Sequence, residues 1–161
     1  AKSKSSDSKQ VEENAVEEKE VDAKVVSASE FFKGVSYDIE SLDEVLELQG
    51  ELESCLYTNT SIEVIQTKAH LFLRSFIHML NKIYEFQNIA YVLSIFDEQL
   101  DRLLALNEKR SFEYFKEIID ELIVWKYEVF IDMTSKDVHS IEDGLYLQVA
   151  QVDIFIEEGS S

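Results

Sequence analysis

The chain has 161 residues, of which 45% are apolar, and its formal net charge at pH 7 is −18. This length and apolar fraction are sufficient for one compact domain with a buried core. The acidic balance argues against binding to nucleic acid, because Lys and Arg are needed to neutralise phosphates, and against binding to an anionic membrane surface. The negative charge is compatible with a basic protein partner, with a bound cation, or with a role in solubility alone.

Residue usage favours a helical protein in a reducing compartment. Proline is absent and glycine is scarce, whereas the turns of β-rich folds depend on both residues. Cys55 is the only cysteine, so no disulfide can form within the chain. No signal peptide is recognisable, and no apolar run approaches the roughly 18 residues of a membrane span. We therefore expect a cytoplasmic protein that does not bind membranes.

Residues 1–30 are mainly Ser, Lys, Glu, Asp, Val and Ala, and no aromatic residue precedes Phe31. Such a segment cannot bury enough apolar surface to offset the entropy lost on ordering. The composition predicts a disordered acidic tail or linker over 1–30, followed by one helical bundle domain over 31–158. Phe31 and Phe32 stand at the boundary, where we expect them to dock on the bundle or on a partner protein.

Helical periodicity dominates from Ser41 onward. Apolar residues recur three and four apart, and pairs such as Ser41 with Glu44 and Thr60 with Glu63 fit capping boxes. Together with short links, this pattern predicts an all-α antiparallel bundle of about five amphipathic helices. The expected helices span about 41–57, 61–86, 89–105, 111–132 and 141–157.

The segment 61–86 carries the longest apolar stripe, a heptad-like seam from Ile62 to Ile83. It is therefore expected to be the central helix. If the other helices left part of this seam uncovered, a homodimer would form through it. The last segment, 141–157, also alternates in places as a strand would. No second strand is available nearby, so a helix is favoured.

The sequence lacks the motifs of common catalytic and metal sites. Neither Glu-x-x-His nor His-Glu-x-x-His occurs, and there is no Gly-rich phosphate loop or Gly-x-Ser-x-Gly elbow. We therefore expect no metal, no cofactor and no catalysis. An enzyme site built from scattered polar residues inside the bundle is kept as an alternative.

The region between Tyr37 and Thr60 contains many acidic residues and no Lys or Arg. Acidic residues near a helix N-terminus are stabilised by the helix dipole, so a solvated face is one interpretation. The functional interpretation is a docking surface for a basic protein partner. The residues assigned to this acidic surface are Asp43, Glu44, Glu47 and Glu51.

His78 is expected to face solvent, because it lies about 200° around its helix from Phe76, the centre of the apolar stripe. Arg74 at i−4 and Lys82 at i+4 flank it on the same face, and Asn81 is close by. An exposed imidazole with cations beside it is the arrangement that a phosphohistidine needs.

The stretch from Leu71 to Lys82, followed by Phe86 and by 93–103, resembles histidine phosphotransfer (HPt) domains. The motif of that family is His-x-x-Lys-Gly. Here the residues are His78-Met-Leu-Asn-Lys, so the lysine comes one place late and the glycine is missing. The resemblance implies a helical bundle that exchanges phosphoryl groups with receiver domains in bacterial two-component signalling.

The favoured hypothesis is a non-catalytic interaction or regulatory module in bacterial signal transduction. Its partner would be a protein that is basic or is a receiver domain. Phosphotransfer at His78 is the first alternative, and an unrecognised enzyme site inside the bundle is the second.

Overall fold

The computed structural model describes residues 25–160, and the part of the predicted tail over 1–24 lies outside the described residues. The described residues form helices and no strand, which confirms the all-α prediction. The elements are α2 (Ala28–Gly34), α3 (Ile39–Tyr57), α4 (Ile62–Asn81), the 3₁₀ turn η1 (Tyr84–Phe86), α5 (Gln87–Ala105), α6 (Lys109–Lys126), the π-helical turn η2 (Tyr127–Ile131) and α7 (Glu142–Ser160).

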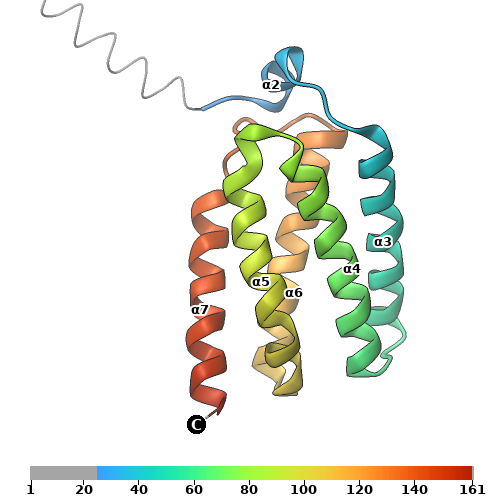
Figure 1. Cartoon of the computed structure of the whole chain (residues 1–161), viewed down its shortest axis with the longest axis vertical. Coiled ribbons are helices and arrows are strands. Elements are labelled where there is room, and N and C mark those ends of the chain that lie inside the picture. The colour runs from blue at the N-terminus through green and yellow to red at the C-terminus, as the bar shows by residue number, and fades with distance from the viewer. Residues whose placement is uncertain (1–24, 161) are drawn as a thin grey trace, which may run out of the picture.

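The five long helices, α3 to α7, run up and down in turn (Figure 1). Helices consecutive in the chain are antiparallel, so α5 and α7, which α6 separates in sequence, run parallel to each other. α4 contacts α3 and α5, whereas α7 contacts α5 and α6. The short α2 lies across the end of the bundle at which α3 and α5 begin (Figure 1).

The apolar stripe of α4 forms the centre of the core. Phe72, Phe76 and Met79 are buried, as are Ile65 near the start of the stripe and Ile83 at its end. Its neighbours α3 and α5 cover it within the chain. Ile62, at the start of the seam, is only half-buried, so a homodimer through an uncovered part of the seam stays a prediction.

An aromatic cluster closes the end of the bundle beneath α2. Phe86 is fully buried and stacks on Phe31 at 5.1 Å between ring centroids, and Trp125 and Phe130 lie edge-on to it at 5.3 and 5.8 Å. Because burying aromatic rings contributes strongly to a core, this cluster fixes where the chain turns between helices.

The same cluster shortens one predicted helix. α4 ends at Asn81 rather than near residue 86, because Ile83 adopts an extended backbone with φ −117°. This bend directs both Ile83 and Phe86 into the core. Similarly, α6 ends at Lys126, and the rest of the predicted helix over 111–132 continues as the π-helical turn η2.

The folded part begins before residue 31. The backbone N–H of Ala28 donates to the carbonyl of Ser135 at 2.9 Å, and that of Val138 donates to the carbonyl of Val26 at 2.8 Å. Ala28 is fully buried. Residues 25–30, which composition assigned to the tail, therefore belong to the bundle, because backbone pairing and one small side chain hold them there.

Two predicted capping boxes are also corrected. Asp38, not Ser41, caps α3, since its carboxylate accepts the backbone N–H groups of Glu40 at 3.0 Å and of Ser41 at 3.4 Å. α4 is capped by the hydroxyl of Ser61, one residue after the predicted Thr60. A carboxylate at the N-cap also complements the helix dipole.

Candidate functional site

The predicted acidic surface on α3 is exposed. Asp43, Glu44, Glu47 and Glu51 are all solvent-accessible. Glu51 is paired with Lys68 of α4 at 3.1 Å, so one of the four carboxylates helps to join two helices. The other three present negative charge along the outer face of α3.

Phe31 and Phe32 pack inside the chain. Phe31 is buried, and Phe32 lies 5.1 Å from the ring of Tyr37 and 5.4 Å from that of Phe130. Phe31 and Phe32 were expected to dock either on the bundle or on a partner protein, and these contacts are contacts with the bundle. Their function here is to close the bundle end.

His78 and Asn81 are exposed, as expected from the helical period. The two cations predicted to flank His78 are engaged elsewhere. Arg74 Nε donates to Asp97 Oδ2 at 3.1 Å, and Lys82 Nζ donates to Asp38 Oδ2 at 2.5 Å.

Lys82 thus stabilises the carboxylate that caps α3. Its hydrogen bond to Asp38 lowers the pKa of that carboxyl to about 2, although partial burial of the carboxyl opposes the shift. Lys82 also donates to the hydroxyl of Ser41 at 2.9 Å. The lysine therefore joins the end of α4 to the start of α3.

His70 joins α4 to α5 through two carboxylates. Its Nδ1 lies 2.6 Å from Asp97 Oδ1, and its Nε2 lies 2.7 Å from Asp101 Oδ1. Within residues 25–160, no group of three or more His, Cys, Asp or Glu side chains is arranged to hold a metal ion.

A buried lysine lies between α6 and α3. Lys126 is fully buried, donates to the side-chain oxygen of Gln49, and lies 4.1 Å from the centre of the Tyr127 ring. Gln49 in turn donates to Glu53 Oε1 at 2.5 Å. Burial lowers the pKa of Lys126 to about 8, and the negative charge of Glu53 opposes this change.

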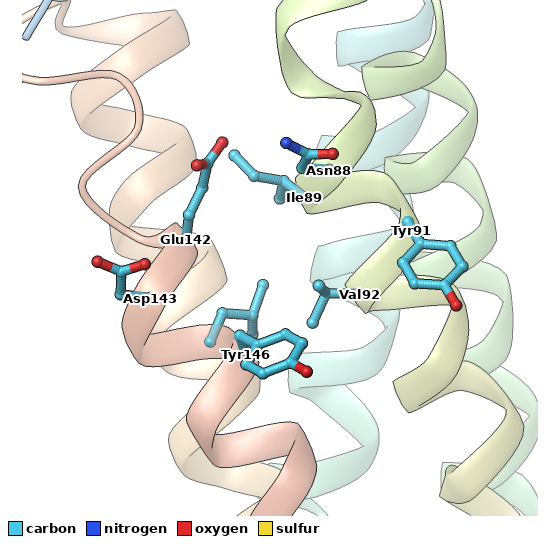
Figure 2. Close-up of a pocket in the computed structure, with 8 residues that line it drawn as sticks. Asn88, Ile89, Tyr91, Val92, Glu142, Asp143 and Tyr146 are labelled. Carbon is cyan, nitrogen blue, oxygen red and sulfur yellow. The ribbon is translucent and has the colours of Figure 1, made fainter. Parts of the chain in front are cut away.

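Sequence reasoning missed a groove between the parallel helices α5 and α7 (Figure 2). Its first part has a volume of about 270 Å³. Tyr91 of α5 and Tyr146 of α7 are 66% and 65% exposed there. Figure 2 shows the Tyr146 ring reaching from α7 toward Val92 of α5. The residues that line this part are Asn88, Ile89, Tyr91, Val92, Glu142, Asp143, Leu145 and Tyr146.

The groove continues along both helices into a second space of about 240 Å³, which shares Val92 and Tyr146 with the first. Ile95, Val149 and Ala150 add apolar surface here. Gln99 is 3% exposed, and its Nε2 donates to the carbonyl of Val149 at 3.2 Å. Its Oε1 has no hydrogen-bond partner among the described residues.

The charge of the groove is negative at both ends. Glu142 and Asp143 lie at the first end and Asp153 lies at the second, all on α7. α7 contains no Lys or Arg, and neither residue type lines the groove within the described part of the chain. Glu142 Oε1 lies 2.9 Å from His139 Nδ1, which leaves Asp143 and Asp153 as the more exposed acids.

The sequence does contain a signal for this groove. Beside its buried stripe, α7 has a second set of apolar residues, and Tyr146, Leu147 and Ile154 of this set are more than half exposed. Of these three residues, Tyr146 lines the groove and Leu147 and Ile154 do not. A surface helix normally shows one apolar face. The second apolar set on α7 indicates a surface that the bundle itself does not cover.

Comparisons with protein families, with curated proteins and with solved structures found no match. No helix in residues 25–160 is both long and apolar enough to cross a membrane.

The buried Lys126 makes the stability of the bundle depend on pH. Above about pH 8 the folded lysine loses its proton, whereas the unfolded chain keeps it until about pH 10.5. The unfolded state then binds more protons, so the free energy of unfolding should rise with pH across this window, by up to about 3 kcal/mol. Urea unfolding of the wild type and of Lys126→Met at pH 7 to 10 measures this. The rise in the free energy of unfolding should be absent in Lys126→Met. If this free energy changed equally with pH in both chains, Lys126 would not be the group responsible.

Proposed function

We propose that this bundle is a non-catalytic protein-interaction module, and that its α5–α7 groove docks a basic segment of a partner protein. The supporting observation is a groove of exposed tyrosines and aliphatic side chains that carries acids at both ends and no cation. Contiguous exposed apolar surface with a polar rim is typical of interaction sites.

The two tyrosines are suited to a cationic partner. Tyr is enriched at the energetically important positions of interfaces, and its ring face attracts Lys and Arg. The chain already makes this contact internally, since the Arg110 guanidinium lies 4.1 Å from the centre of the Tyr114 ring. Tyr91 and Tyr146 offer the same ring faces at the open groove.

Charge favours a basic partner over a second copy of the chain. The net charge is −18, and a symmetric contact through the groove would bring Asp143 and Asp153 of one copy close to those of the other. Like charges facing each other across an interface cost several kcal/mol. A basic segment gains from the same carboxylates.

The groove is also favoured over the acidic surface on α3. The α3 acids supply charge, which mainly affects the association rate and its salt dependence. The groove adds apolar surface that a partner can bury, and such burial is the larger source of affinity.

The partner class is tested by selecting displayed random peptides on the whole chain. The recovered peptides should be rich in Lys or Arg together with apolar residues. Their retention should fall at least about tenfold on Ala150→Arg, because that variant places bulk and positive charge in the groove. Gln151→Arg is the matched control, because Gln151 is exposed on the same helix but does not line the groove.

Equal retention on the two variants would contradict docking in the groove. A second pair of variants separates the groove from the acidic surface on α3. Asp143→Asn with Asp153→Asn should weaken binding, whereas Asp43→Asn with Glu47→Gln should leave it nearly unchanged. If the two α3 substitutions weakened binding and the two α7 substitutions did not, the docking surface would lie on α3.

Phosphotransfer at His78 is a second candidate, favoured by the exposure of that imidazole and by the resemblance to HPt domains. The bacterial signalling context and a receiver-domain partner rest on this resemblance. Arg74 and Lys82 are paired with Asp97 and Asp38, and these carboxylates offset the positive charge that the two cations could offer a phosphoryl group. Incubation with a phosphorylated receiver domain tests it: acid-labile label on the wild type and none on His78→Gln would support transfer. No label on the wild type would contradict it.

An enzyme site inside the bundle is the third possibility. Lys126 is bonded to Gln49 there, whereas buried oxygen atoms of Gln99, Ser111, Glu121 and Gln148 have no hydrogen-bond partner among the described residues. The interaction module has the stronger support, because the α5–α7 groove combines apolar surface with charge at an accessible place.

A further inference from the structure

We infer that the segment taken by the α5–α7 groove is an amphipathic α-helix whose two cations lie about eleven residues apart. This inference rests on the proposed docking function and adds the conformation and charge spacing of the partner segment.

The helical conformation follows from the hydrogen bonding of the groove walls. Residues 25–160 contain no strand, and both walls of the groove are α-helices whose backbone groups bond internally. An extended segment would find no sheet edge with which to pair. A docked helix satisfies its own N–H and C=O groups, so it can bury apolar side chains without leaving backbone groups unpaired.

The length of the groove sets the length of the helix. Its lining runs from Asn88 to Gln99 on α5 and from Glu142 to Asp153 on α7. At 1.5 Å per residue, these spans measure about 15 to 17 Å, or roughly three helical turns. A partner helix of that length would place side chains at i, i+3/i+4 and i+7 against Tyr146, Val92 and Ile95.

The two ends of the groove set the charge spacing. Asp143 lies beside the Asn88 end, and Asp153 lies beside the Gln99 end. Residues eleven apart on a helix are separated by about 16 Å and point within roughly 20° of each other. Two cations at this spacing would therefore reach both acids from one face of the docked helix.

The test uses synthetic peptides of about 18 residues, which exceed the groove by about a turn at each end. The first has apolar residues on one face and two Lys eleven apart. The second has the same composition with the two Lys five apart, and the third has proline at its centre, which breaks the helix. Fluorescence anisotropy gives the Kd of each for the whole chain, and circular dichroism reports peptide helicity on binding.

The first peptide should bind at least about tenfold tighter than the other two, gain helicity, and lose at least about tenfold in affinity on Ala150→Arg but not on Gln151→Arg. If all three peptides bind equally and Ala150→Arg still weakens their binding, the inferred helical conformation and cation spacing of the partner segment are wrong. Docking of a basic segment in the groove would then still hold. If Ala150→Arg weakens none of them, the proposed docking function fails as well.

Discussion

The wide apolar stripe of α4 is the constraint on which the rest of the bundle depends. Because Phe72, Phe76 and Met79 must all leave water, α3 and α5 have to pack along the whole of α4. The last helix then finds room only beside α5 and α6. α7 thus lies at the edge of the bundle, and no helix within residues 25–160 covers its second set of apolar residues.

The distribution of charge has a similar origin. Several of the few cations join helices, as Lys68 does with Glu51, Arg74 with Asp97 and Lys82 with Asp38. Exposed ion pairs of this kind contribute little stability each, but they occupy cations that would otherwise offset the acids. The surplus of negative charge is consequently displayed on α3 and α7. On α7 it adjoins an apolar groove.

The helical periodicity predicted which face of each of the five long helices is buried, but it did not predict where all of them end. The exposure of His78 and the burial of Phe76 follow from the helical period alone. The end of α4 does not, because the burial of Phe86 in the aromatic cluster overrides local helical preference. α2 has only 7 residues, too few for its periodicity to stand out from the tail beside it.

Sites formed by two helices were not predictable from one sequence. The contacts of His70 with Asp97 and Asp101 join positions about thirty residues apart. The groove likewise combines residues of α5 with residues of α7, which depends on these two helices being parallel neighbours. The hydrophobic pattern of a helix reports which face is buried, but it does not report which helix covers that face.

The location of binding tests the central claim most directly. Amide chemical shifts of the ¹⁵N-labelled whole chain would be followed by NMR while the helical peptide with two spaced lysines is added. The largest changes should fall in residues 88–99 of α5 and 142–153 of α7. Changes centred on residues 43–51 of α3, or spread evenly over the bundle, would contradict a docking site in the α5–α7 groove.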